Sequence, residues 1–169
     1  MSYNLQNKTV IITGANSGIG KAAALQLAAA GANVVMACRS LERGKQALED
    51  VKQASGNPQV ELMQLDLASQ ASIRQFAAEF LASHPRLDVL IHNAANFDHT
   101  LKQPVLTEDG VETIFATNHV GPFLLTHLLL ERLKASAPSR VITVASKGLM
   151  VYPTLDIEFD NLNGERRFS

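Results

Sequence analysis

The chain has 169 residues, a formal net charge of -1 at pH 7, one cysteine, 46% hydrophobic residues and 18% charged residues. A chain this close to neutral lacks the general positive charge that draws proteins to nucleic acid or to anionic membranes, so binding must come from a local site. The single cysteine, Cys38, excludes an internal disulfide and a multi-cysteine metal site, and it favours a reducing, cytoplasmic location. The chain begins with a short polar segment, residues 1–8, which predicts neither a secretory signal nor a membrane anchor.

Short apolar runs rich in β-branched residues alternate with longer helical patterns along the chain. This alternation is typical of βαβ units, in which helices bury both faces of a parallel sheet. No linker, repeat or apolar run of about 18 residues interrupts it, so we predict one domain over residues 1–169 and no membrane span. The predicted strands are residues 9–13, 33–37, 60–65, 89–92 and 140–144, and the predicted helices are residues 18–30, 41–54, 69–83 and 107–134, the last with a break near Asn118.

Residues that cap or end helices separate these elements. Gly31 and Gly56 follow the first two predicted helices, in the position where glycine commonly ends a helix. Ser40 can cap the second helix, and Asp66 and Ser69 can cap the third. Right-handed crossovers with one reversal of direction then predict an α/β fold, a Rossmann-type doubly wound parallel sheet of strand order 3-2-1-4-5. The reversal creates a crevice at the carboxyl ends of the strands, where ligands bind in such sheets.

A glycine-rich loop, T-G-A-N-S-G-I-G at residues 13–20, lies between the first predicted strand and the first predicted helix. Backbone amides and the positive end of the helix can hold a pyrophosphate there, provided that the backbone approaches closely. Three glycines in one turn can also form nothing more than a turn, so the loop alone leaves both interpretations open. The residues of the loop that we expect to bind a dinucleotide are Gly14, Asn16, Ser17, Gly18, Ile19 and Gly20.

The spacing T-G-x-x-x-G-x-G resembles the loop of the short-chain dehydrogenase/reductase family rather than the general G-x-G-x-x-G fingerprint. Asp66 and Leu67 resemble the family's acidic segment beside the adenine ring. His92-Asn93-Ala94-Ala95 resembles the family's N-N-A-G, with His92 and Ala95 as departures. The resemblance therefore adds five expected cofactor-binding residues, which are Asp66, Leu67, Asn93, Ala94 and Ala95.

The resemblance also implies an oxidoreductase that interconverts an alcohol and a carbonyl. Asn118, in T-N-H-V-G, matches the family's catalytic asparagine, and Ser146, in V-A-S, matches its catalytic serine. The family's remaining pair is Tyr-x-x-x-Lys, in which a cation lowers the pKa of a phenol from about 10 so that it can exchange a proton near neutral pH. Neither Tyr3 nor Tyr152 has a lysine four residues later, and Lys147 is expected at the surface.

The segment after Ser146 resembles the loop that retinol dehydrogenase-like branches of the family place before the tyrosine helix. We therefore expect the chain to stop before the catalytic pair and to be catalytically incomplete as it stands. The alternative is a non-enzymatic NADP(H)-binding module or sensor. The branch suggests a small, lipophilic alcohol or carbonyl substrate, and the family suggests a homo-oligomeric parent protein. Residues 96–104 either line the substrate crevice or form a plain surface loop.

The coenzyme is predicted from the end of the second strand, where the sequence is Ala37-Cys38-Arg39-Ser40. An NAD site usually offers a carboxylate to the ribose 2′-hydroxyl, and here Cys38 takes that position. Arg39 and Ser40 can instead bind a 2′-phosphate, which favours NADP over NAD. The alternative for Arg39 is to solvate the strand end or stack on adenine. Lys21 either adds positive potential or is a solvated helix residue.

Two further expectations concern metals and the edge of the sheet. The five histidines have no metal-ligand spacing with a second ligand on one helix face, so no metal site is predicted. The strand at 140–144 is the last one and would be an exposed apolar edge, which predicts marginal solubility.

Overall fold

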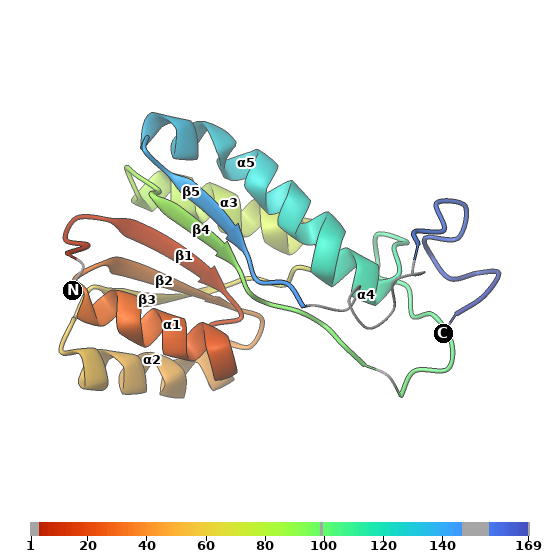
Figure 1. Ribbon diagram of the computed structural model, residues 1–169, viewed down its shortest axis with the longest axis horizontal. Helices are drawn as coiled ribbons and strands as arrows, with labels where there is room; N and C mark the ends of the chain where they lie inside the picture. Colours follow the sequence, from red (N-terminus) through yellow and green to blue (C-terminus); the bar gives the residue numbers. More distant parts are fainter. Residues whose placement is uncertain (1–3, 99, 147–155, 169) are drawn as a thin grey trace.

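The structure, a computed structural model, describes residues 4–98, 100–146 and 156–168. Five parallel strands form one sheet in the order β3-β2-β1-β4-β5, with helices on both faces (Figure 1). This confirms the predicted α/β doubly wound sheet and its strand order. The winding direction reverses at β1, which pairs with β2 on one side and with β4 on the other.

The bounds of the elements follow the predictions to within one residue, with one exception in the fourth helix. The strands are β1 (Thr9–Thr13), β2 (Asn33–Cys38), β3 (Val60–Gln64), β4 (Val89–His92) and β5 (Arg140–Thr143). The helices are α1 (Gly18–Ala29), α2 (Leu41–Ser55), α3 (Gln70–Ser83), α4 (Thr113–Phe115) and α5 (Gly121–Ala135), with a π-helical turn, η1 (Ala116–Val120), between α4 and α5.

The expected helix start at Thr107 was wrong, because residues 107–112 form a turn. The amide of Thr107 donates to the carbonyl of Val111 at 2.9 Å, and Gly110 takes a left-handed conformation with φ of 73°. Glu112 then begins the helix, since its carboxylate accepts hydrogen bonds from the amides of Ile114 at 3.0 Å and Phe115 at 2.8 Å. The predicted break near Asn118 is confirmed as the π-helical turn.

The predicted caps of the second and third helices are present. The hydroxyl of Ser40 accepts from the amide of Arg43, and that of Ser69 accepts from the amide of Ser72. The carboxylate of Asp66 closes the turn before α3 by accepting from the amide of Ala68. Gly56 ends α2 in the left-handed conformation. Local sequence signals therefore set where these helices start and stop.

The core consists of two layers on opposite faces of the sheet. Successive residues of β1 point to opposite faces, so Ile11 packs into the α3 and α5 layer while Val10 and Ile12 pack into the α1 and α2 layer. All five residues of β1 are buried, as expected for a central parallel strand. This double burial fixes the strand ends relative to the helices, and the cleft described below opens at those ends.

Asp88 ties the starts of β1 and β4 together. Its side chain is 4% exposed and accepts hydrogen bonds from the amide of Thr9 at 2.9 Å, from Lys8 at 3.0 Å, and from Arg86 at 2.6 and 2.7 Å. Burial raises the pKa of Asp88, but the hydrogen bonds from Arg86, Thr9 and Lys8 outweigh burial and bring the pKa to about 2. The ionised carboxylate therefore stabilises the folded chain.

Replacing this carboxylate is expected to remove a pH-dependent part of the stability. The pKa is near 3.9 in an unfolded chain and lower in the folded one, so the stabilisation is complete well above pH 4 and disappears as the pH falls through about 2. Asp88→Asn should lower the free energy of unfolding by roughly 2 kcal/mol at neutral pH, and by much less near pH 2. Urea unfolding at both pH values measures this, with the exposed Glu108→Gln as the control. Equal losses for Asp88→Asn at both pH values would contradict it.

The outer edge of β5 has no strand beside it among the described residues. Val141 and Ile142 on this strand are 46% and 42% exposed. An unpaired apolar edge can pair with another chain, so we expect concentration-dependent association. Val141→Lys should reduce the associated fraction measured by light scattering after size-exclusion chromatography. A monomer for the unsubstituted chain at every concentration would show that the edge is protected.

Candidate functional site

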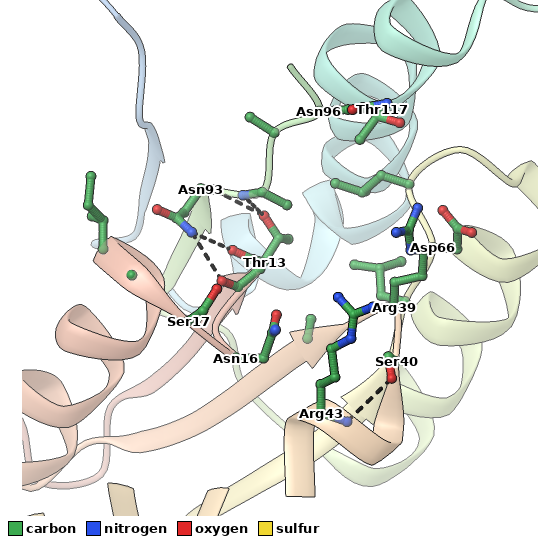
Figure 2. A pocket seen from close by; sticks show the side chains of 18 residues that line it. Thr13, Asn16, Ser17, Arg39, Ser40, Arg43, Asp66, Asn93, Asn96 and Thr117 are labelled. Atoms are coloured by element: carbon green, nitrogen blue, oxygen red, sulfur yellow. Dashed lines mark hydrogen bonds between the residues drawn. The ribbon is translucent and has the colours of Figure 1, made fainter. Parts of the chain in front are cut away.

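A cleft of about 620 Å³ opens at the carboxyl ends of the central strands, where the winding direction reverses. Its walls come from the glycine loop, the β2–α2 turn, the β3–α3 turn, the segment after β4 and the η1 turn (Figure 2). The lining residues are Thr13, Gly14, Asn16, Ser17, Gly18, Ile19, Ala37, Arg39, Ser40, Arg43, Leu65, Asp66, Leu67, Asn93, Ala94, Ala95, Asn96 and Thr117.

Every residue predicted to bind the cofactor lines this cleft, with the single exception of Gly20. Gly20 is buried behind the loop, where a Cβ would overlap the carbonyl of Gly14 and lie 2.5 Å from the side-chain nitrogen of Asn93. Glycine at this position therefore allows α1 to pack closely against the ends of β1 and β4. A Cβ on Gly18 would meet no atom within 4 Å, so the space over the loop is open.

The N-terminus of α1 differs from those of α2 and α3. Ser17 precedes the helix in an extended conformation, yet its side chain makes no capping hydrogen bond, and the first turn contains no acidic residue. Ser40 and Ser69 both cap their helices. The amides and positive dipole end of α1 therefore face the cleft without a side-chain acceptor among the described residues, which suits an anion.

A set of hydrogen bonds locks the glycine loop to the end of β4. The hydroxyl of Thr13 accepts from the amides of Asn93 and Ala94, both at 3.0 Å (Figure 2). The side-chain nitrogen of Asn93 donates to the carbonyls of Thr13 at 3.0 Å and Gly14 at 3.3 Å. The sequence suggested Asn93 as a cofactor contact. In the structure its side-chain nitrogen instead joins the ends of β1 and β4.

Position 38 offers no carboxylate to the cleft. Cys38 is 1% exposed and does not line the cleft. Burial raises the pKa of its thiol, although hydrogen bonds from the amides of Ala15 and Asn16 act in the opposite direction. The thiol therefore stays neutral beneath the glycine loop.

Two guanidinium groups reach into the cleft beside this turn (Figure 2). They belong to Arg39, which was predicted, and Arg43, which sequence reasoning missed. Neither forms an ion pair within the part of the chain that the structure describes. Lys21 is not a third free cation, because its ammonium pairs with Asp50 on α2 at 2.5 Å. The signal that could have identified Arg43 is its place in the first turn of a helix that Ser40 caps, directly after the strand end that carries Arg39.

The two residues with expected catalytic roles, Asn118 and Ser146, do not line the cleft. The side chain of Asn118 forms two hydrogen bonds of 2.7 Å with the backbone of Asn96, one to its amide and one to its carbonyl. Asn118 itself does not line the cleft, but its neighbour Thr117 and its partner Asn96 do. Ser146 follows the end of β5, is exposed, and is not brought into the cleft. Tyr3, Lys147 and Tyr152 lie outside the described residues.

His92, the first departure from N-N-A-G, connects the sheet to α5. Its Nε2 lies 2.7 Å from the hydroxyl of Thr126, which itself donates to the carbonyl of Pro122. The hydroxyl proton is therefore used, so His92 donates from Nε2. Burial lowers the pKa of His92, which keeps the ring neutral. The described residues contain no group of three or more possible metal ligands.

A match to a known family covers most of the chain. The family model described as short chain dehydrogenase matches residues 8–155. The chain is 54% identical over 157 residues to the human dehydrogenase/reductase SDR family member 13, covering 90% of this chain and 40% of that protein. It is 46% identical over 164 residues to human retinol dehydrogenase 13, covering 96% of this chain and 47% of that protein. The chain thus spans less than half the length of these two relatives.

A solved structure shares the fold. A short chain dehydrogenase from Shigella flexneri, complexed with NADP, superposes with a TM-score of 0.72 at 27% identity, covering 86% of this chain and 62% of that one. No helix within the described ranges is long and apolar enough to cross a membrane. The superposition agrees with the doubly wound α/β fold.

The lock between Thr13 and Asn93 can be tested with a pair of isosteric and conservative substitutions. Thr13 is 1% exposed, and Thr13→Val keeps the shape of its side chain. The substitution removes the hydroxyl that accepts from the amides of Asn93 and Ala94. The free energy of unfolding should fall by roughly 2 kcal/mol, because buried unpaired donors are costly. Thr13→Ser keeps the hydroxyl and should lose less than half as much. Urea unfolding measures both, and equal losses would show that the methyl group, not the hydroxyl, matters.

Proposed function

The chain belongs to the short-chain dehydrogenase family, and from this premise we propose that it binds NADP(H) in the cleft at the carboxyl ends of its strands. The observation that carries this proposal is that the guanidinium groups of Arg39 and Arg43, which form no ion pair with any residue in the described ranges, line the cleft beside a buried neutral Cys38. The parent protein would be an oxidoreductase that interconverts an alcohol and a carbonyl.

The pyrophosphate fits the glycine loop. The open space over Gly18 is where a Cβ would lie, so the backbone amides of the loop can contact an anion directly. The N-terminus of α1 adds its positive dipole, and no acidic residue in the first turn opposes it. Asn16, Ser17 and Ile19 complete this part of the binding surface.

The adenosine half fits between the two turns that follow β2 and β3. Arg39 and Arg43 would bind the ribose 2′-phosphate, because guanidinium groups suit bidentate contact with phosphate oxygens. Asp66 and Leu67 would lie along the adenine, and Ser40 would add a hydroxyl donor. NAD lacks the 2′-phosphate and would leave both guanidinium groups without their ligand. The NADP present in the Shigella flexneri structure supports this choice of coenzyme.

Bound NADP(H) would supply hydride transfer, while the residues of this chain bind and orient the reacting groups. Asn93, Ala94 and Ala95 would form the wall beside the nicotinamide half. We assign to Asn118 the role of the family's catalytic asparagine. Its two hydrogen bonds with the backbone of Asn96 hold the segment that follows β4. Ser146 is proposed to orient the substrate oxygen. A lipophilic substrate, a homo-oligomeric parent protein and a cytoplasmic location remain predictions from the sequence.

A second candidate is a non-enzymatic NADP(H)-binding module or sensor. The observation that favours it is the sequence itself, in which no tyrosine is followed four residues later by lysine. Without a phenol whose pKa is lowered by a cation, proton exchange with a substrate oxygen would be slow at neutral pH. Binding of NADPH without oxidation of NADPH by a panel of aldehydes and ketones would support this candidate for the chain as printed.

The choice of coenzyme is tested by titrating NADPH and NADH into the chain by calorimetry. Arg39→Ala and Arg43→Ala should each weaken NADPH binding about tenfold or more, since each removes charge-assisted hydrogen bonds to phosphate. NADH binding should change by less than about threefold, because exposed charges without a partner contribute little.

Lys21→Gln is the matched control. It removes the same charge from the neighbouring helix, but its ammonium is already paired with Asp50, so the ratio of the NADPH and NADH dissociation constants should not change. Equal affinity of the unsubstituted chain for both coenzymes, or an unchanged ratio in both arginine variants, would overturn the assignment of the 2′-phosphate site.

A further inference from the structure

We propose that Asn163, which lies outside the cleft, is a positioning residue for α4 and η1, which carry the cleft-lining residue Thr117. We call Thr117 and the neighbouring lining residue Asn96 the far wall of the cleft. The proposal rests on the proposed function, since it assigns Asn163 to the wall of the same cleft that includes Asn96 and Thr117. Asn163 belongs to the segment 156–168, which lies beside α4 although more than 40 residues separate them in sequence (Figure 1).

Asn163 bridges the turn that precedes α4 with both ends of its side-chain amide. Its oxygen accepts from the amide of Glu112 at 3.0 Å, and its nitrogen donates to the carbonyl of Gly110 at 3.2 Å. The turn at 107–112 is irregular, so these two backbone groups have no regular helix or sheet partner. One side chain therefore supplies both the acceptor and the donor that the turn needs.

The amide of Glu112 is a group that the backbone of a helix leaves without a partner. Glu112 is the N-cap residue of α4, and its buried carboxylate already accepts from the amides of Ile114 and Phe115. In a capping box, the residue three positions later returns a hydrogen bond to the N-cap amide. That residue is Phe115, which has no acceptor, so the reciprocal bond comes from Asn163 instead.

The segment that carries Asn163 is internally braced. The side-chain oxygen of Asn161 accepts from the amide of Arg166, and its nitrogen donates to the carbonyl of Arg167 and to the carboxylate of Glu158. Arg167 also pairs with Glu158 at 2.6 Å. A Cβ on Gly164 would lie 2.8 Å from the Phe168 ring and 3.5 Å from Pro104, so the segment packs closely against the loop before the turn. Hydrogen bonds and an ion pair within residues 158–167 therefore fix the backbone that carries Asn163.

The helix held by Asn163 leads directly to the cleft. Four residues after Thr113, the first residue of α4, Thr117 lines the cleft and donates its hydroxyl proton to the carbonyl of Thr113. Asn118 follows and fixes Asn96, a second lining residue, through its two backbone hydrogen bonds. A shift at Glu112 would therefore move Thr117 and Asn96 together. The glycine loop and the two arginines belong to other elements and would not move.

This separation gives two independent probes. Inorganic pyrophosphate would contact only the glycine loop and the N-terminus of α1, whereas any ligand with an adenine would also reach Leu67, which lies against Gly121 at the end of η1. The complete NADPH would also contact the wall formed by Asn96 and Thr117. A residue that merely stabilises the fold would change both affinities alike or neither. A residue that positions the far wall would change only the affinity for NADPH.

The experiment measures dissociation constants of inorganic pyrophosphate and NADPH by calorimetry for the 169-residue chain. Asn163→Ala should weaken NADPH binding on the order of fivefold and leave pyrophosphate binding unchanged. Glu165→Gln is the matched control, because Glu165 is an exposed residue of the same segment, and it should change neither constant. If Asn163→Ala does not fold, Asn163→Asp keeps the acceptor for Glu112 and loses the donor to Gly110, and it should weaken NADPH binding selectively by a smaller factor.

The possible outcomes separate the two proposals. If the unsubstituted chain binds neither ligand, the proposed function fails. If it binds both, and the variants at Asn163 bind both ligands as well as the unsubstituted chain does, the positioning role is overturned. An equal loss of affinity for both ligands would also overturn it, because Asn163 would then act only on the stability of the fold.

Discussion

The candidate site depends on the hydrogen bonds that join the end of β1 to the end of β4. Backbone hydrogen bonds join neighbouring strands of the sheet, and those between β1 and β4 stop at Ile12 and Ile91. Beyond that point Thr13 and Asn93 continue the connection through their side chains. The glycine loop is therefore held at its first residues, and the amides of Ala15 and Asn16 bond to the thiol of Cys38 beneath it, while the uncapped N-terminus of α1 faces the cleft. Rigidity below the loop and open space above it are both needed for a preformed anion site.

The positive charge of the cleft depends on which cationic side chains have an ion-pair partner. Lys8 and Arg86 surround Asp88 at the opposite end of the strands, and Lys21 pairs with Asp50 between α1 and α2. Arg39 and Arg43 have no such partner in the described parts of the chain and line the cleft. The chain as a whole is nearly neutral, so its attraction for a phosphate comes from this local arrangement rather than from net charge.

The far wall is built differently, from an irregular turn and a π-helical turn. The side chains of Glu112, Asn118 and Asn163 form hydrogen bonds with backbone groups of α4, of the segment after β4 and of the turn before α4. Asp109 adds a further connection, because its carboxylate accepts from the amide of Gln70 at the start of α3. Each of these side chains satisfies backbone groups that would otherwise lack partners near the protein interior. The wall therefore depends on residues that are distant in sequence, in contrast to the glycine loop.

The sequence by itself determined the fold class, the strand order, the caps at Ser40 and Ser69, and most of the residues that line the cleft, because strand and helix periodicity, caps and glycine spacing are local signals. It misplaced the start of the fourth helix, since the choice between helix and turn at residues 107–112 depends on Gly110, Glu112 and the remote Asn163. Only the tertiary structure decided that Cys38 is buried, that Lys21 is neutralised by Asp50 and that Arg43 joins Arg39. The physical reason is that burial and charge pairing arise between elements that the fold brings together, whereas a sequence pattern records only what neighbours along the chain can form.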